Sequence, residues 1–136
     1  MKLIISSKIM AELQGAARSG APNEICGLLL GQNQHVSEAR MTNNVAMDPR
    51  RHFEVDPALL IAAEKDMRSG GLPIIGYYHS HPDGPVEPSV TDAGSAAPDG
   101  RIWLIINGQE AAAWQATLSG RLLARFDPIE LECALD

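Results

Sequence analysis

Helical segments alternate in this sequence with short apolar runs, and turn residues separate each segment from the next. The apolar run over residues 24–31 has the length and content of a buried strand. Asp56 followed by Pro57 is typical of a helix N-terminus, where the aspartate caps and the proline needs no hydrogen bond. Asn107-Gly108 lies between two further apolar runs and predicts a β-hairpin. The order of these segments predicts an α/β (α+β) fold with a mixed central β-sheet flanked by helices.

The same patterns predict the remaining elements. The expected strands cover residues 3–6, 24–31, 36–42, 52–55, 72–81, 101–106, 111–118, 121–126 and 129–131. The expected helices run from Ser6 or Ser7 to about residue 18, over residues 58–68 and over residues 89–97. Trp103 and Trp114 fall on the two strands of the hairpin, so we expect them to pack across it. No linker divides the chain, and we expect a single domain over residues 1–136.

The charge balance excludes some classes of partner. Lys and Arg number 11 and Asp and Glu number 17, which gives a net charge of −6. Such an acidic chain is not expected to bind nucleic acid phosphates or anionic lipid. No apolar run approaches the ~20 residues of a membrane span, and the pattern of a signal peptide is not seen. We therefore expect a cytoplasmic protein with no nucleic-acid or membrane partner.

Two histidines near the end of the strand expected over residues 72–81 form a candidate metal site. Side chains alternate along a strand, so His79 and His81 point to the same side, with backbones about 7 Å apart. Two imidazoles at that spacing can converge on one ion at metal–nitrogen distances of about 2 Å. Pro82 follows directly and ends the strand, because proline cannot donate to a sheet.

A third ligand is expected from the short helix that follows. Ser89 has the character of an N-cap, and Asp92 falls in the first turn, where the helix dipole favours a carboxylate. Two histidines and one aspartate leave the fourth tetrahedral position to water, which is the open arrangement of a catalytic zinc. Cys26 and Cys133 lack paired spacing, so a closed structural zinc site is less favoured.

The motif as a whole resembles that of the JAMM (MPN-type) metalloproteases, in particular their short bacterial and archaeal members. The family pattern is an upstream glutamate, then His-x-His-Pro, six residues, and Ser-x-x-Asp. This chain matches it with Glu24, the segment from His79 to Pro82, and the segment from Ser89 to Asp92. The resemblance covers roughly residues 1–107 and implies an MPN fold, which is similar to that of the cytidine deaminases.

The resemblance also implies a role for each matched residue. His79, His81 and Asp92 would bind one Zn²⁺ per chain, and water would occupy the fourth position. Glu24 would act as general base and then acid, and Ser89 would donate a hydrogen bond to the developing oxyanion. The implied reaction is hydrolysis of a peptide or isopeptide bond at the C-terminal tail of a ubiquitin-like or sulfur-carrier protein, often one ending in Gly-Gly.

Several alternatives remain open in the sequence. The same surface could serve as a non-catalytic binding module for a ubiquitin-like partner, although the complete ligand set favours an enzyme. A zinc deaminase is not favoured, because the Pro-Cys-x-x-Cys motif of that class is absent. Cys26 lies two residues after Glu24 and is either near the site or a small buried residue. The residues that bind substrate are unknown, although the strand expected over residues 52–55 offers an edge for an extended tail.

Overall fold

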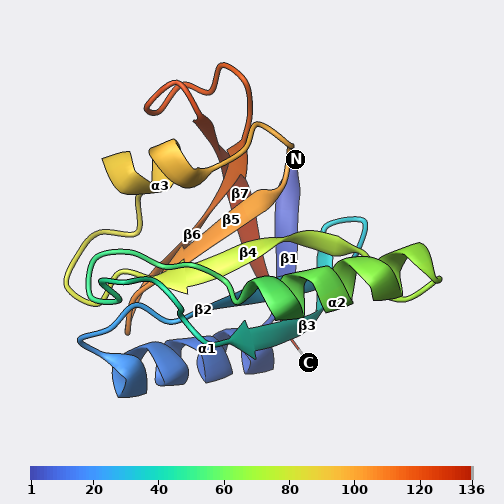
Figure 1. The fold of residues 1–136 in the computed structure, drawn as a ribbon, viewed down its shortest axis with the longest axis horizontal. Coiled ribbons are helices and arrows are strands. Elements are labelled where there is room, and N and C mark those ends of the chain that lie inside the picture. Colours follow the sequence, from blue (N-terminus) through green and yellow to red (C-terminus); the bar gives the residue numbers. More distant parts are fainter. Residues whose placement is uncertain (136) are drawn as a thin grey trace.

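The computed structural model describes residues 1–135, which form a β-barrel with helices packed around it (Figure 1). The strands are β1 (Lys2–Ser6), β2 (Cys26–Gln32), β3 (His35–Thr42), β4 (Ile74–Ser80), β5 (Ile102–Ile106), β6 (Ala111–Ala116) and β7 (Phe126–Ala134). The helices are α1 (Ser7–Gly20), α2 (Pro57–Arg68) and α3 (Val90–Ser95). Among residues 1–135, no helix is both long enough and apolar enough to cross a lipid bilayer.

The strand order around the barrel is β1-β3-β2-β4-β5-β6-β7. The pairs β1–β3, β1–β7 and β4–β5 are parallel, and the others are antiparallel, so the mixed sheet predicted from the sequence is confirmed. Closure into a barrel was not predicted. The seam between β1 and β3 is short, because it contains a single registered pair, Ile4 with His35.

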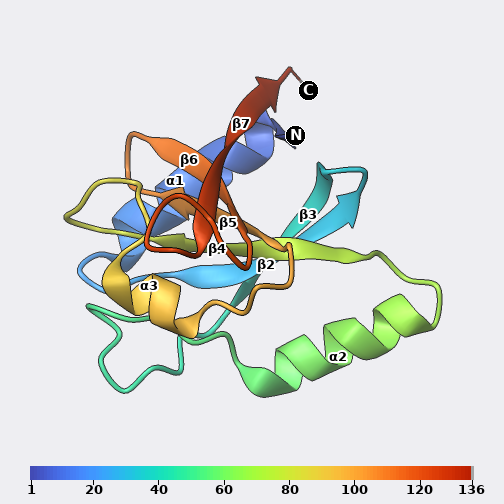
Figure 2. The same ribbon diagram turned by 90° about the horizontal axis from the view of Figure 1, so that it is seen from above.

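The helices α1 and α2 lie on opposite sides of the layer formed by β2 and β4 (Figure 2). The alternation of side chains along β2 accounts for this arrangement. Leu29 packs in the main core with α1, whereas Leu28 and Leu30 pack on the other face with α2. All three leucines are at most 2% exposed, so β2 is buried on both faces as its unbroken apolar run predicts.

The helix N-termini form where the sequence predicts them. The Ser6 hydroxyl accepts a hydrogen bond from the Ile9 N–H at 3.1 Å, and the Asp56 carboxylate accepts one from the Ala58 N–H at 3.0 Å. Each cap satisfies a backbone donor that the first helical turn leaves without a partner. The expected cross-hairpin pair is also confirmed, because Trp103 lies directly opposite Trp114 in the β5–β6 register.

The strand expected over residues 52–55 is wrong. This segment is a loop, in which Val55 forms only an isolated bridge with Asn44. The Asn44 side chain occupies backbone groups that a neighbouring strand would use: its amide donates to the His52 carbonyl at 2.9 Å and its oxygen accepts from the Glu54 N–H at 3.1 Å. A side chain therefore replaces the ladder here.

The two strands expected at the C-terminal end are also wrong in their boundaries. Residues 121–125 form a turn, in which Leu123 and Ala124 have φ values of 54° and 55°. Non-glycine residues in this left-handed region break a strand. The chain then enters β7 at Phe126 and remains in it through the expected gap at residues 127–128, since Asp127 and Pro128 pair with β6.

Candidate active site

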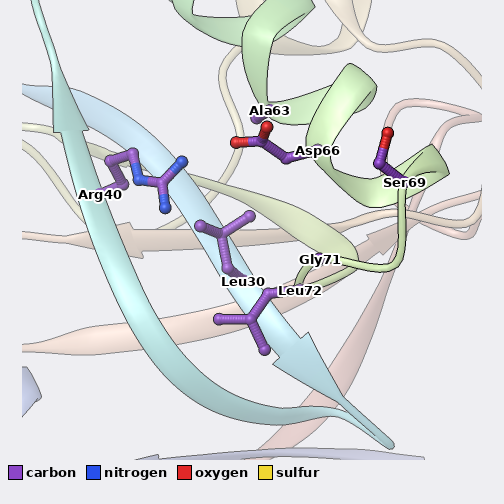
Figure 3. A pocket seen from close by; sticks show the side chains of 7 residues that line it. All are labelled: Leu30, Arg40, Ala63, Asp66, Ser69, Gly71 and Leu72. Carbon is purple, nitrogen blue, oxygen red and sulfur yellow. The ribbon is translucent and has the colours of Figure 1, made fainter.

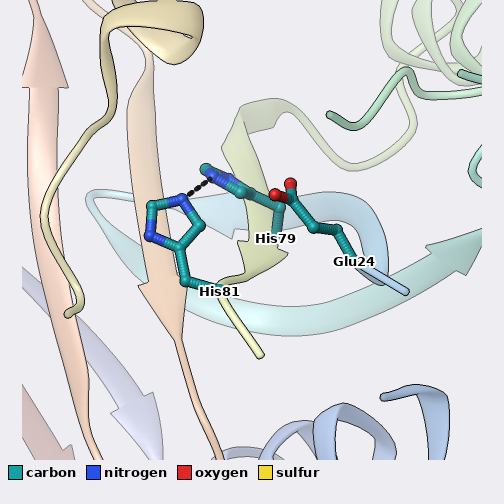
Figure 4. A group of neighbouring side chains, drawn as sticks. All are labelled: Glu24, His79 and His81. Carbon is teal, nitrogen blue, oxygen red and sulfur yellow. Dashed lines mark hydrogen bonds between the residues drawn. The ribbon is translucent and has the colours of Figure 1, made fainter. Parts of the chain in front are cut away.

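The two motif histidines meet at the end of β4. His79 is the penultimate residue of β4, and His81 follows the strand directly. Their side chains point to the same side, as the strand alternation predicts, and the two Nε2 atoms are 3.0 Å apart (Figure 4). The His81 N–H donates to the Ile106 carbonyl at 2.8 Å, so the backbone after β4 stays attached to β5.

A backbone contact fixes the tautomer of His81. Its Nδ1–H donates to the Pro85 carbonyl at 2.9 Å. A neutral imidazole that carries its proton on Nδ1 presents a lone pair at Nε2, which is the form that binds a metal ion. The loop after β4, which contains Pro82, Pro85 and Pro88, therefore orients a ligand atom toward His79.

His79 is completely buried and enclosed by aromatic rings. The Phe53 ring stacks on its imidazole with centroids 4.1 Å apart and an interplanar angle of 16°. Trp103 packs edge-on against the same imidazole at 5.6 Å. These contacts leave the imidazole little freedom to rotate. Nδ1 of His79 has no hydrogen-bond partner within residues 1–135.

Asp92 completes the cluster from the first turn of α3. Helix α3 contains only six residues and begins with a reciprocal capping box. The Asp92 N–H donates to the Ser89 hydroxyl at 3.0 Å, and the Ser89 N–H donates to Asp92 Oδ2 at 2.9 Å. The same Oδ2 atom lies 3.2 Å from His79 Nε2 and 3.1 Å from His81 Nε2. The capping box therefore positions this carboxylate despite the shortness of the helix.

The three donor atoms fit a tetrahedral metal ion. They form a triangle with sides of 3.0, 3.1 and 3.2 Å. A tetrahedral zinc ion with bonds of 2.0–2.1 Å separates its ligand atoms by about 3.3 Å, close to the observed sides. Electrostatics favours the same occupant, because a cation bound between these atoms takes the place of the proton through which His81 Nε2 otherwise contacts the Asp92 carboxylate.

Burial and charge act in opposite directions on the titration of this cluster. Burial acts to raise the pKa of Asp92, but its hydrogen bonds with His79, His81 and the Ser89 N–H outweigh burial and hold the pKa well below its usual range. Burial lowers the pKa of His79 despite the nearby carboxylate. For His81 burial also acts downward, but the contacts with Asp92 and the Pro85 carbonyl raise the pKa overall. Asp92 is therefore an anion held between two imidazoles.

Strand register brings Glu24 to these residues. Strands β2 and β4 are antiparallel, with Cys26 opposite His79. One residue further, the Ile25 N–H donates to the Ser80 hydroxyl at 2.8 Å, and the Ser80 N–H donates to the Ile25 carbonyl at 3.0 Å. Glu24 therefore lies beside His81, just before β2 begins. One carboxylate oxygen of Glu24 and one ring nitrogen of each histidine lie within 4.8 Å of one another.

The Glu24 carboxylate is buried and partly without partners. The residue is 7% exposed, and its Oε1 atom has no hydrogen-bond partner in the described part of the chain. Burial raises the pKa of Glu24 to about 7, although the nearby His81 acts in the opposite direction. A carboxyl group with a pKa near neutrality can both accept and return a proton at physiological pH.

Asn44 fixes the backbone around Glu24, although no motif in the sequence marks it as a site residue. Its side-chain amide donates to the Glu24 carbonyl at 2.9 Å and to the His52 carbonyl at the same distance. Its oxygen accepts from the N–H groups of Ala46 and Glu54, each at 3.1 Å. Asn44 thus connects the segment that carries Glu24 to the loop that carries Phe53. The only signal in the sequence is an asparagine between a strand and a loop.

Cys26 is a buried core residue and not part of the cluster of donor atoms. Its Sγ lies 3.6 Å from the Thr42 hydroxyl and 3.9 Å from the carbonyls of Asn43 and Glu54. Burial raises the pKa of the thiol, which keeps it protonated. The structure therefore shows Cys26 as a small buried residue that lies opposite His79 in the β2–β4 register and contributes no donor atom to the cluster.

A hollow of about 420 Å³ adjoins the site behind the rings that enclose His79. Phe53 and Trp103 separate the hollow from His79, since both rings contact the imidazole and also line the hollow. Val55, Leu60 and Tyr77 extend the apolar lining. Glu54 and Asp99 add two carboxylates to the lining. The hollow can therefore hold apolar groups, with acidic groups nearby.

Comparisons with known proteins agree with the fold and the motif. The sequence profile described as prokaryotic homologs of the JAB domain matches residues 6–117. The chain is 34% identical over 99 residues to the desampylase of Haloferax volcanii, an alignment that covers 71% of each protein. It is 32% identical over 120 residues to the probable TtuB-protein conjugate cleaving protease of Thermus thermophilus, covering 81% of this chain and 80% of the relative.

Solved structures extend the likeness to the whole described fold. The solution structure of a protein from Desulfitobacterium hafniense superposes with a TM-score of 0.79 at 31% identity, covering 100% of this chain and 93% of the other. A JAB1/MPN domain protein from Archaeoglobus fulgidus gives a TM-score of 0.61 at 19% identity, covering 96% of this chain and 97% of the other, which shows the fold alone. This chain belongs to the prokaryotic JAB family, the JAMM (MPN-type) family that its motif resembles.

Proposed function

We propose that this protein is a zinc-dependent hydrolase that cleaves a peptide or isopeptide bond at the C-terminal tail of a ubiquitin-like or sulfur-carrier protein. The names of two relatives, a desampylase and a probable conjugate cleaving protease, support this substrate class. The observation that carries the proposal is one cluster, in which two imidazoles and one carboxylate converge beside a second carboxylate, one oxygen of which has no hydrogen-bond partner within residues 1–135. We further propose that residues 1–136 act as one catalytic domain in the cytoplasm.

His79, His81 and Asp92 are the proposed zinc ligands. The triangle of their donor atoms and the lone pair that His81 Nε2 presents support this assignment. A bound zinc ion supplies Lewis acidity toward the scissile carbonyl and lowers the pKa of a bound water to about 7.

Glu24 is the proposed carrier of the proton. Its unpartnered Oε1 would accept a proton from the attacking water and then transfer it to the leaving amine. The pKa of about 7 supports this dual use, because neither transfer is then strongly uphill. Asn44 would act as a positioning residue, since it holds the Glu24 backbone and contacts no reacting atom.

Ser89 is the proposed donor to the oxyanion. Its oxygen already accepts the Asp92 N–H as a helix cap. A hydroxyl carries one donor and two lone pairs, so the Ser89 O–H can still donate to a substrate oxygen. The capping and catalytic roles are therefore compatible in one side chain.

The hollow behind Phe53 is the proposed site for part of the substrate tail. Residues 52–55 are a loop, so docking of the tail on a free strand edge there, as expected from the sequence, has no strand to support it. The apolar lining and the two carboxylates, Glu54 and Asp99, favour apolar and basic side chains. A Gly-Gly end, which has no side chains, would lie between this hollow and the proposed zinc ligands.

The test uses a ubiquitin-like carrier with a short peptide fused after its Gly-Gly end, and a second substrate with the same carrier joined to a lysine side chain. Each is incubated with the protein, with and without a zinc chelator, and its intact mass is measured. Loss of the group after Gly-Gly, blocked by chelator and restored by added zinc, is the expected result. The substrate that is cut distinguishes the peptide bond from the isopeptide bond.

An unchanged mass for both substrates in the presence of zinc would contradict the proposed reaction on this carrier. Binding of the carrier without cleavage, unaffected by chelator, would instead support the non-catalytic binding module. Cleavage that survives complete removal of metal would refute the zinc dependence.

A further inference from the structure

The outer edge of β3 is unpaired beyond its short seam with β1. On its inner side β3 pairs with β2 from residue 42, opposite Cys26, to residue 35, opposite Gln32. A register shift at Leu30 and Gly31 leaves Ser37 as an extra, unpaired residue in this ladder. On its outer side it pairs only at His35, and the neighbouring Gln34 carbonyl accepts the Ile4 N–H at 2.8 Å. No other described strand pairs with the outer edge from Ser37 to Thr42. An unpaired edge of this length is a template for another strand.

The helices leave hollows beside this edge on both faces. On the face of α1 a hollow of about 470 Å³ is lined in part by Ser37, Ala39 and Met41 of β3 and by Ile9 of α1. On the face of α2 a hollow of about 310 Å³ includes Arg40 (Figure 3). An added strand would therefore have room for its side chains on both faces of the sheet.

The α2-side hollow is charged, which limits the kind of strand that fits. Arg40 faces Asp66 of α2 across it (Figure 3). Within β3, the Arg40 Nε donates to Glu38 at 2.8 Å, and both side chains remain about two-fifths exposed. A neighbouring strand must therefore place complementary charges opposite Glu38 and Arg40.

The sequence of β3 is complementary to itself about Ala39. In an antiparallel pair with a two-fold axis at Ala39, Glu38 of each copy lies opposite Arg40 of the other, on the α2 face. On the α1 face the same register places Met41 opposite Ser37. Met41 is 53% exposed, and this pairing would cover it. A two-fold axis requires this kind of self-complementary surface.

We propose that two copies of this chain associate through antiparallel pairing of their β3 edges, with the two-fold axis at Ala39. The partner is therefore a second copy of this chain. The proposal is independent of the proposed hydrolase activity, because β3 contributes no residue to the zinc ligands or to the proton carrier.

The first test is the molar mass of the full chain, measured by light scattering across a range of protein concentrations. The expected result is a monomer–dimer equilibrium. A monomeric mass at the highest concentration overturns the proposal, and so does a higher oligomer with no dimer.

Charge reversal tests the register. Glu38→Arg places four arginines around the axis, and Arg40→Glu places four glutamates there. Each single variant is expected to raise the dimer dissociation constant by about tenfold or more, because opposite charges become like charges across the pair. The double variant Glu38→Arg with Arg40→Glu restores complementarity and is expected to recover the wild-type constant. Single variants that dimerise like the wild type overturn the proposal, and circular dichroism checks their folding.

A cysteine cross-link tests the position of the axis. Opposed residues of an antiparallel pair have Cα atoms about 4.5–5.5 Å apart, within the range of a disulfide. In a Cys133→Ser background, which removes the exposed native thiol, Ala39→Cys is expected to form a disulfide-linked dimer under mild oxidation. Met41→Cys is the matched control, because the register places the two copies of that residue roughly 13 Å apart. Cross-linking at residue 41 and not at residue 39 contradicts the axis.

Discussion

Replacing Glu24 with glutamine separates its charge from its shape. The substitution keeps the size of the side chain but removes the group that would accept the proton. General acid–base catalysis typically contributes a factor of about 100 to 10,000 to the rate. We expect Glu24→Gln to lower kcat by that factor while the bound zinc, measured by elemental analysis, stays at one per chain. A variant that retains full turnover would show that another group moves the proton.

The same variant has a stability signature that requires no substrate. Burial raises the pKa of Glu24 from 4.5 to about 7, so the fold favours the protonated form. At about 1.36 kcal/mol for each unit of pKa, a rise from 4.5 to about 7 corresponds to an upper bound of about 3.4 kcal/mol. Solvent screening at the open side of the site reduces the figure to roughly 1–2 kcal/mol. Glutamine does not titrate and avoids this cost.

The direction of the pH dependence follows from linkage. The stability associated with protonated Glu24 is fully present below pH 4.5 and is lost as the pH rises through about 7. In metal-free protein, the advantage of Glu24→Gln over the wild type should therefore grow between pH 5 and pH 7 and then level off. Urea unfolding of both proteins in the presence of chelator, repeated across this pH range, measures the difference in their free energies of unfolding. Glu54→Gln, at an exposed neighbouring glutamate, is the control, and an equally flat profile for both variants would refute the reasoning.

Three further substitutions test the rest of the site. Asp92→Ala removes a proposed ligand, so zinc content and turnover should both disappear, and a variant that retains tightly bound zinc would contradict the assignment. Ser89→Ala should lower kcat by about 100- to 1,000-fold and cost about 1 kcal/mol as a lost cap, whereas Ser89→Gly should show a similar kinetic loss at a cost of only a few tenths. Asn44→Ala breaks four hydrogen bonds and should destabilise the fold by about 2–4 kcal/mol in urea unfolding, unlike Asn43→Ala at the exposed neighbouring position.

Local patterns in the sequence predicted the local geometry well. The alternation of side chains along β4 and the capping pattern of α3 were enough to bring His79, His81 and Asp92 together. Each of these contacts depends on residues within one short stretch, where backbone periodicity fixes the relative directions of the side chains. The helix caps at Ser6 and Asp56 were predictable for the same reason.

Contacts between distant segments could not be derived in this way. The residues alone did not show that Glu24 reaches the histidines, because its position depends on the register of β2 against β4. The family motif supplied that expectation. No local pattern marks Asn44, because its partners lie in two separate segments, and the strand predicted over residues 52–55 is wrong for the same reason. Closure of the barrel likewise depends on the pairing of β1 with β7.

The position of Glu24 just before β2, with the two histidines at the end of β4, has a consequence for folding. The proposed metal ligands come from the single stretch between His79 and Asp92, so a metal ion can be captured once β4 and the turn into α3 have formed. Glu24 joins only when β2 pairs with β4, a contact between segments far apart in the chain that closes a long loop. With the proposed ligands and proton carrier, loading of metal and gain of activity would therefore be separate events during refolding. A chain that has bound zinc but not yet paired β2 would be metallated and inactive.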